Sequence, residues 1–164
     1  MGRYRAPDPP SSPYITPAGY QNLQDEQKRL WKFRREVAEA VSVAAAEGDR
    51  SENAEYIYRK KQLRELDRRI RYLQKRLPVL KVIDTVGNRD QIFFGALVTL
   101  LDDDGEKRDY QIVGPDEINP DGGSISIDSP VAKALLKKRC GDHCSVKIGG
   151  SEQCYTVMAI DYVK

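Results

Sequence analysis

A group of carboxylates around Gly48 has the side chains needed to hold a hard divalent cation. Glu47, Asp49, Glu52 and Glu55 lie within nine consecutive residues. Magnesium prefers oxygen ligands, and it is usually held by one or two carboxylates together with water and phosphate oxygens. Asp49 and Glu52 are therefore candidates for a metal-binding or catalytic pair that needs further ligands from elsewhere.

Helix capping is the alternative explanation for the same residues, and the pattern by itself favours it. Asp49 is followed three residues later by Glu52, the arrangement of a capping box, and Ser51 is an equally good N-cap. Acidic side chains are also stabilised at the positive end of a helix. The two roles are compatible, so both stay open at this point.

A second candidate site is a stripe of basic residues downstream. Residues 59–76 contain nine basic residues against two acidic ones, a local charge of +7. Five of the nine are spaced 3, 4, 3, 4, which places them on one helix face: Lys61, Arg64, Arg68, Arg71 and Lys75. A solvated face usually mixes both signs through i,i+4 pairs, whereas like charges at this spacing repel. We therefore expect an anionic partner such as a nucleic acid, contacted through its backbone because few aromatic residues accompany the stripe.

Cysteine and histidine near the C-terminus suggest a third possibility, a structural zinc site. The candidates are Cys140, His143, Cys144 and Cys154. The set lacks a second cysteine pair with the spacing typical of zinc knuckles, so small packing residues are the simpler explanation. Three cysteines make a poor disulfide framework and are typical of a reducing cytosol.

Two helices must position the carboxylates and the basic stripe. Thr16 and Pro17 have the form of an N-cap and a first helical residue. Apolar residues then follow a heptad pattern that Gln27 and Arg34 interrupt: Leu23, Leu30, Val37, Val41 and Ala44. A second heptad seam is cleaner and is expected to end near Pro78: Leu63, Leu66, Ile70, Leu73, Leu77 and Leu80. Helices joined by a short turn at Gly48 must fold back into an antiparallel hairpin, which carries the carboxylates at its tip.

A β-rich segment follows the hairpin. Residues 81–86, 92–101, 107–113, 124–128, 144–148 and 154–163 are predicted as strands, with turns at residues 102–105 and 120–123. Ser129 and Pro130 predict a short helix after the fourth of these strands. The sequence thus predicts an α+β protein with three parts: a mobile proline-rich tail over residues 1–15, a coiled-coil hairpin over 16–80 and a compact domain over 81–164.

Composition restricts the function classes. The chain has 164 residues, 32% of them charged, with a net charge of only +2. No apolar run approaches the roughly 18 residues of a membrane span, and the N-terminus lacks the apolar core of a signal peptide. We therefore expect a soluble cytoplasmic protein without a membrane partner. The self-contained antiparallel pairing of the hairpin favours a monomer.

Several stretches of the sequence resemble the Gre transcript-cleavage factors of bacteria. Residues 48–56 (GDRSENAEY) resemble the tip motif of that family, and residues 60–73 (KKQLRELDRRIRYL) resemble the basic second arm of its GreB branch. Further similarity lies at residues 93–96 (FFGA), 125–130 (ISIDSP), 134–138 (ALLKK) and 159–163 (AIDYV). The resemblance runs in register from about Tyr14 to the end and leaves the proline-rich start outside it.

This resemblance implies a coiled-coil hairpin joined to a domain similar to the FKBP fold. In such factors the compact domain docks on the rim of the secondary channel of RNA polymerase, and the hairpin enters the channel. The tip then stimulates endonucleolytic cleavage of the 3′ end of nascent RNA in backtracked complexes, which places the factor near the nucleoid. The protein would be a cofactor of the polymerase, not an enzyme with its own active site.

The resemblance also assigns roles to individual residues. Asp49 and Glu52 would be the tip carboxylates, sharing a loosely held Mg²⁺ with the polymerase and orienting the attacking water. Basic residues of the second arm would bind the extruded RNA: Lys60, Lys61, Arg64, Arg68, Arg71 and Lys75. Asp128, Ser129 and Pro130 would belong to the loop that contacts polymerase. No cofactor is expected to bind stably to the isolated protein.

Two other functions remain open. Domains similar to FKBP can be prolyl isomerases, which use an aromatic-lined pocket, but the aromatic residues of the β-rich segment suit an ordinary core. Some hairpin proteins instead enter the same channel to inhibit or modulate the polymerase without stimulating cleavage. The presence of both Asp49 and Glu52, with the basic stripe, favours cleavage.

Overall fold

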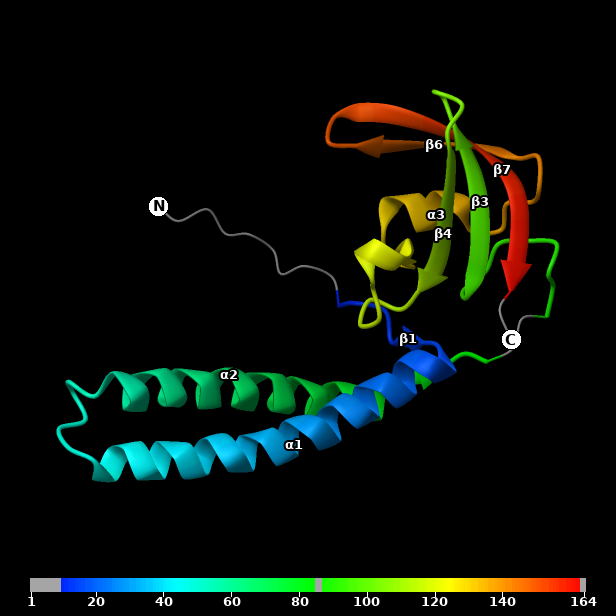
Figure 1. The fold of residues 1–164 in the computed structure, drawn as a ribbon. Helices are drawn as coiled ribbons and strands as arrows, with labels where there is room; N and C mark the ends of the chain where they lie inside the picture. Colours follow the sequence, from blue (N-terminus) through cyan, green and yellow to red (C-terminus); the bar gives the residue numbers. More distant parts are fainter. Residues whose placement is uncertain (1–9, 85–86, 163–164) are drawn as a thin grey trace, which may run out of the picture. The chain divides into compact units, whose positions relative to one another are not determined.

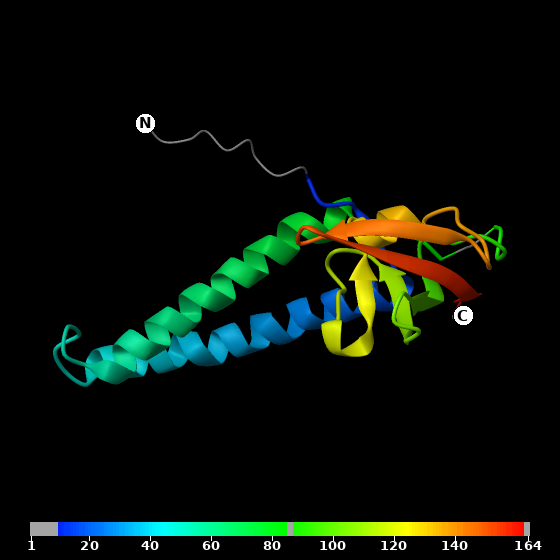
Figure 2. The same ribbon diagram turned by 90° about the horizontal axis from the view of Figure 1, so that it is seen from above.

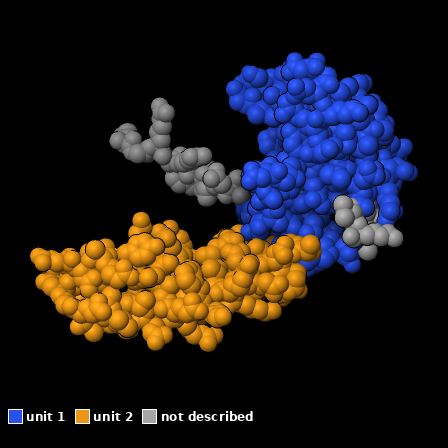
Figure 3. All heavy atoms as spheres, viewed as in Figure 1, with its two compact units in different colours: residues 1–17, 81–164 blue, residues 18–80 orange. Residues whose placement is uncertain are grey.

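The computed structural model describes residues 10–84 and 87–162. The chain divides into two compact units, which Figure 3 colours separately. A helical unit spans residues 18–80. A globular unit combines the residues from 81 onward with the N-terminal segment up to Pro17.

The helical unit is a hairpin of two long helices. Helix α1 spans Pro17–Ala46 and helix α2 spans Ala54–Arg76, followed by a 3₁₀ turn over Leu77–Val79. The two helices run antiparallel and side by side (Figures 1 and 2). Pro17 is the first residue of α1, and α2 ends two residues before Pro78, as the sequence predicted. Neither helix, nor any other in the described residues, is long and apolar enough to cross a membrane.

The predicted apolar seam holds the two helices together. Its buried members come from both arms: Leu23, Val37, Ala44, Leu66, Ile70, Leu73 and Leu77. The polar interruption at Arg34 is explained by an ion pair across the hairpin, because its guanidinium donates to the carboxylate of Asp67. A second pair joins the arms where Arg69 donates to both carboxylate oxygens of Glu26, at 2.7 and 2.9 Å.

The globular unit is built on a five-stranded sheet in the order β5-β4-β3-β7-β6. Its strands are β3 Ala96–Asp102, β4 Lys107–Val113, β5 Ser124–Ser126, β6 His143–Ile148 and β7 Ser151–Tyr162. The pairs β3–β4, β3–β7 and β6–β7 are antiparallel, whereas β5 runs parallel to β4. Alternate residues of β3 are buried, which is the period-two pattern of a sheet with one face on a core.

A short helix covers the buried face of this sheet. Helix α3 spans Pro130–Leu135, and the Ser129 hydroxyl caps it by accepting a hydrogen bond from Ala132 N at 3.2 Å. Ala132 and Leu135 join a core that includes Ile92, Leu100 and other fully buried residues of the strands. The predicted fold class, a helical hairpin followed by a mainly antiparallel sheet domain with a short helix, is confirmed.

The N-terminal segment differs from the sequence prediction. A mobile tail was expected through residue 15, but Tyr14–Ile15 forms strand β1 and pairs in parallel with β2, Lys81–Val82. Ile15 is fully buried. The proline-rich composition concealed this strand because only two apolar residues carry it. The remainder of the predicted tail, residues 1–9, lies outside the described residues.

Some predicted strand boundaries are also wrong. The strand expected over 92–101 begins only at Ala96, because Gly95 adopts a φ of 85° and turns the chain. The strand expected over 81–86 is reduced to β2, although residues 85 and 86 lie outside the described part, as does Val163 of the last predicted strand. The predicted strand at 107–113 matches β4.

Candidate functional site

The turn between the two helices is organised by Asn53. Its Oδ1 accepts a hydrogen bond from Tyr56 N at 3.0 Å and caps α2, and its Nδ2 donates to the carbonyl oxygen of Ala44 at 2.8 Å. One amide side chain therefore satisfies a backbone group at the end of each helix. The sequence offered Asp49 and Ser51 as caps of the second helix, and this expectation is wrong. Because Asn53 does the capping, the carboxylates of the turn are available for other contacts.

The Asp49 carboxylate is fixed within the turn. Its Oδ1 accepts two hydrogen bonds from Ser51, from the backbone N at 2.9 Å and from the hydroxyl at 2.8 Å. These bonds favour the ionised form and lower the pKa of Asp49 below its ordinary value. Its carbonyl oxygen accepts from Asn53 N at 3.1 Å. Asp49 is thus a charged, oriented and exposed carboxylate at neutral pH.

The other three carboxylates of the turn have different surroundings. Glu55 pairs with Arg59 at 2.7 Å, which neutralises its charge. Glu47 lines an open hollow of about 500 Å³ beside α1, together with Glu36, Glu39 and Glu55. Glu52 is exposed, and its carboxylate has no hydrogen bond within the part of the chain that the structure describes. Asp49 and Glu52 are therefore the pair best suited to an external partner.

This pair does not make a complete metal site. Across residues 10–84 and 87–162, no group of three or more histidine, cysteine, aspartate or glutamate side chains is arranged to hold a metal ion. Two hard carboxylate ligands nevertheless fit the donor preference of Mg²⁺, which commonly completes its shell with water and phosphate oxygens. Asp49 and Glu52 can therefore contribute to a magnesium site only in combination with ligands from another molecule.

The basic stripe is solvent-exposed along its whole length on α2. Its five members and the neighbouring Lys60 are all exposed: Lys60, Lys61, Arg64, Arg68, Arg71 and Lys75. None of the six has an ion pair with any described carboxylate. By contrast, Arg59 and Arg69 on the same helix are paired with Glu55 and Glu26. The structure thus separates basic residues that stabilise the hairpin from basic residues that are available to an anion.

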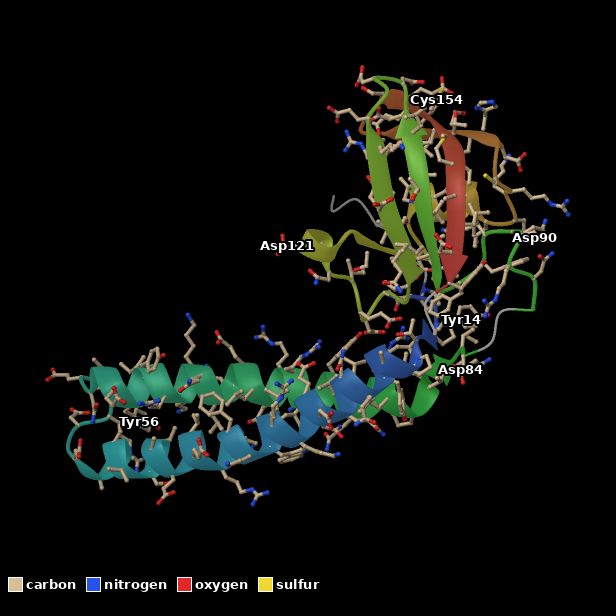
Figure 4. The ribbon with its side chains drawn as sticks, turned by 45° about the vertical axis from the view of Figure 1, so that its right-hand side comes forward. Tyr14, Tyr56, Asp84, Asp90, Asp121 and Cys154 are labelled. Atoms are coloured by element: carbon tan, nitrogen blue, oxygen red, sulfur yellow. The ribbon has the colours of Figure 1, made fainter. Side chains whose placement is uncertain are left out.

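Among the described residues, one of these six cations, Lys60, lies beside an aromatic ring, as does the neighbouring Arg59. The Lys60 ammonium lies 5.3 Å from the ring centre of Tyr56, and the Arg59 guanidinium lies 5.6 Å from that of Tyr58. Tyr56 lies at the turn end of the hairpin in Figure 4. Tyr58 is 59% exposed. These tyrosines flank the start of the stripe, and their cation–π contacts keep the neighbouring side chains extended over the rings.

The three residues predicted to dock on a partner lie at the start of α3 in the globular unit. The Asp128 carboxylate accepts from Ser12 N at 2.8 Å and from the Ser12 hydroxyl. Its backbone N donates to the Ser126 hydroxyl at 3.0 Å. Ser129 is the N-cap of α3, and Pro130 is exposed at its first position. Ser129 therefore has a local structural role, Asp128 is half-buried and bonded to Ser12, and Pro130 lies at the surface.

The cysteine and histidine residues are not brought together. Cys144 is buried in the sheet core, where burial raises the pKa of its thiol. Cys140 contacts Met158 O at 2.9 Å, and His143 contacts the Thr156 hydroxyl at 2.8 Å. Cys154 lies at the end of the sheet that carries the β3–β4 turn (Figure 4), where its backbone N donates to Asp103. Cys144 is thus a packing residue, as the sequence suggested, whereas Cys140, His143 and Cys154 are exposed.

Sequence reasoning missed Asn53 and Ser12. Asn53 is one of three good capping residues within five positions, and the sequence does not rank them. Ser12 contacts a residue 116 positions away, so no local pattern could reveal it. The only signal at Ser12 was its place before Pro13, which favours an extended backbone.

Comparison with known protein families covers nearly the whole described chain. Residues 13–82 match the family model described as "Transcription elongation factor, N-terminal", and residues 87–162 match "Transcription elongation factor, GreA/GreB, C-term". The first match contains the hairpin with its tip carboxylates and basic stripe. The second contains the sheet and α3.

Two individual relatives indicate the same family as the family models. The chain is 52% identical to transcription elongation factor GreB of Xanthomonas axonopodis pv. citri, covering 99% of this chain and 98% of that relative. It is 49% identical to GreB of Pseudomonas aeruginosa over the same shares of the two chains. A solved structure, GreA factor homolog 1 of Thermus thermophilus, is 28% identical over 90% of this chain and 97% of that one, with a TM-score of 0.42. By the two family models and the two GreB relatives, the chain belongs to the GreA/GreB family of transcription elongation factors.

Proposed function

We propose that this protein binds bacterial RNA polymerase, inserts its hairpin into the secondary channel and stimulates cleavage of the 3′ end of backtracked nascent RNA. The relatives named GreB and the resemblance of the tip and second-arm motifs support this proposal. Release of arrested complexes would be the result. The protein acts in this proposal as a cytoplasmic, monomeric cofactor of the polymerase.

The observation that carries the proposal is the separation of charge on the hairpin. Asn53 caps α2, which leaves Asp49 ionised and Glu52 exposed at the tip. On α2, six exposed basic side chains have no described carboxylate partner. If the charges served only solubility, the basic side chains would be paired with carboxylates. The hairpin forms such pairs at Arg34 and Arg69.

The tip supplies part of a metal site in this account. Asp49 and Glu52 offer hard oxygen ligands, and the polymerase carboxylates and an RNA phosphate would supply the others. A second Mg²⁺ held there would supply electrostatic stabilisation of the phosphodiester and a more acidic water. Ser51 holds one carboxylate oxygen of Asp49, and the second oxygen would bind the metal.

The remaining site residues would bind the RNA and the polymerase. Lys60 and the basic stripe would contact phosphates of the extruded RNA, as expected for binding without base reading. Asp128 and Pro130 would contact the channel rim from the globular unit. None of these groups forms an independent catalytic site, because the hydrolytic machinery would belong to the polymerase.

A cleavage assay tests the proposal against the alternative of a channel regulator without cleavage activity. A backtracked elongation complex carrying 3′-labelled RNA is mixed with the protein at neutral pH in Mg²⁺. Rapid release of short 3′ fragments is expected. Binding to the polymerase without fragment release would contradict the cleavage function and support a regulator that occupies the channel.

A further inference from the structure

The basic stripe of α2 changes character at its end nearest the turn. Counting back four residues from Lys61 in the same heptad spacing reaches Ile57, which is apolar and 51% exposed. Tyr58 lies three residues before Lys61, so its side chain is a neighbour of that cation on the helix surface, and it is more exposed still. The row of cations thus gives way to an exposed apolar and aromatic surface within about one helical turn.

The ring of Tyr58 is flanked by a cation that is itself held in place. The Arg59 guanidinium lies over this ring, 5.6 Å from its centre. Arg59 donates to the carboxylate of Glu55 at 2.7 Å and to the side-chain oxygen of Gln62 at 3.2 Å. Within the described part of the chain, the Tyr58 hydroxyl makes no hydrogen bond. The hairpin therefore orients the Tyr58 ring without burying it.

Two other tyrosines of α2 are less suited to bind a partner. Tyr56 is half-buried, and its hydroxyl accepts a hydrogen bond from Lys60 at 3.3 Å. Tyr72 lies about 21 Å further along the helix than Tyr58 and carries the Arg69 guanidinium 5.3 Å from its ring centre. Of the three rings, Tyr58 combines the greatest exposure with a position close to the turn.

We infer that Tyr58 is the surface on which one unpaired base of the extruded RNA stacks. Every base has a flat π face, so an exposed aromatic ring beside a row of cations holds a base while the cations hold the backbone phosphates. This charge complementarity selects single-stranded RNA over an apolar protein surface as the occupant. The inference rests on the insertion and RNA binding of the proposed function, but not on cleavage.

Four substitutions separate stacking from other contacts. Tyr58→Ala removes the ring and suits an exposed helical position, because alanine is the strongest helix former. Tyr58→Leu keeps apolar bulk without a π face. Tyr58→Phe keeps the ring and loses only the hydroxyl. Phe33→Ala is the control, because it removes an exposed ring from α1.

The test compares the affinity of each variant for two complexes of the same polymerase, one backtracked with an extruded RNA 3′ end and one without extruded RNA. Binding is measured without added Mg²⁺, so that the RNA stays intact. Tyr58→Ala and Tyr58→Leu should bind the backtracked complex roughly five- to fiftyfold more weakly and the other complex as the wild type does. Tyr58→Phe and Phe33→Ala should match the wild type in both. Equal weakening for both complexes would show that Tyr58 contacts the polymerase, and it would overturn the inference, as would wild-type binding by Tyr58→Leu.

An RNA with abasic nucleotides in the extruded segment assigns the contact to a base. This RNA lacks the bases but keeps the phosphates, so Tyr58→Ala should differ from the wild type by less than about twofold. An undiminished effect on the abasic RNA would overturn the inference and leave the proposed function intact. Fragment release by the wild type is measured in parallel with Mg²⁺. Its absence would contradict the proposed cleavage function, while the affinities would still decide whether a base stacks on Tyr58.

Discussion

The side-chain nitrogen of Asn53 donates a hydrogen bond across 2.8 Å to the carbonyl oxygen of Ala44, the residue two positions before the last of α1. The same side chain caps α2 through its oxygen. One amide thus joins the end of one helix to the beginning of the next. The geometry of the tip carboxylates depends on this connection, because Asn53 N also donates to the carbonyl oxygen of Asp49.

Asn53 is therefore expected to contribute to stability through both of its polar atoms. Asn53→Ala removes the cap and the bond to Ala44, and it should lower the free energy of unfolding by about 1–2 kcal/mol. Asn53→Asp keeps the acceptor but not the donor, so its loss should be smaller. Chemical unfolding followed by circular dichroism measures both. Equal losses for the two variants would show that the cap on α2 contributes nothing, and an unchanged stability of Asn53→Asp would show that the donor to Ala44 contributes nothing.

The sequence predicted the helical hairpin because its signals are periodic and local. The heptad seam, the proline at residue 17 and the proline at residue 78 each restrict the backbone within a few positions. Ser129 and Pro130 defined the start of α3 for the same reason. Asp49, Ser51 and Asn53 are all suitable N-cap residues for α2. Asn53 is the cap in the structure, and its side chain also reaches the carbonyl oxygen of Ala44.

Long-range contacts were not predictable from a single sequence. The parallel pairing of β1 with β2 and of β5 with β4 joins segments without any shared local pattern. The contact between Ser12 and Asp128 is of the same kind. The sequence also could not show which basic residues form ion pairs. The carboxylate that pairs with Arg69, for example, belongs to Glu26 on the other helix.

The basic stripe should determine how binding of the backtracked complex depends on salt. Lys61→Gln/Arg64→Gln/Arg68→Gln removes three cations that have no ion pair. The plot of log affinity against log salt should therefore become less steep by about 2, at roughly 0.7 per phosphate contact with a single strand. Titration of a backtracked complex at several salt concentrations measures this slope.

A control outside the stripe is Lys107→Gln, which removes one exposed cation from β4. Its slope should equal that of the wild type. A triple variant with an unchanged slope would mean that these side chains do not contact RNA phosphates.

Stability of the hairpin should decrease in acid because of Glu26. The hydrogen bonds from Arg69 lower the pKa of Glu26 in the folded state below its ordinary value of 4.5. The unfolded chain therefore binds the proton more readily, and the contribution of the pair, complete above pH 4.5, is lost as the pH falls through the folded pKa.

Glu26→Gln tests this pH dependence. The variant should be less stable than the wild type by about 0.5 kcal/mol at pH 7, as for other exposed ion pairs, and equally stable at strongly acidic pH. Unfolding in urea over a pH series measures the difference. A difference that stays constant across the series would contradict the assignment to the ionised pair.

Gly114 allows the N-terminal segment to lie against the globular unit. A Cβ atom added at Gly114 would stand 2.0 Å from Tyr14 O, which is backbone and cannot rotate away. Gly114→Ala should therefore displace β1 and lower the free energy of unfolding by about 1–3 kcal/mol, the usual cost of overpacking. Gly87→Ala is a control, because a Cβ there meets nothing within 4 Å.

Hydrogen exchange distinguishes this displacement from a general loss of stability. In Gly114→Ala, protection should be lost first at the amides of Lys81 and Ile83, which donate to the N-terminal segment. Retained protection at these two amides would mean that the chain accommodates the methyl group without moving β1.

The most direct test of the account compares two carboxylates of the turn with two carboxylates on α1. Asp49→Asn/Glu52→Gln and the control Glu36→Gln/Glu39→Gln each remove two negative charges from exposed positions of the hairpin. Cleavage rates of 3′-labelled RNA in backtracked complexes are measured at saturating factor over a range of Mg²⁺ concentrations. The account predicts that the tip variant binds polymerase but loses stimulation by about 100-fold or more, as for other residues that stabilise transition-state charge, while the control keeps the wild-type rate. Equal cleavage by both variants and the wild type would contradict a role of the tip carboxylates in the reaction.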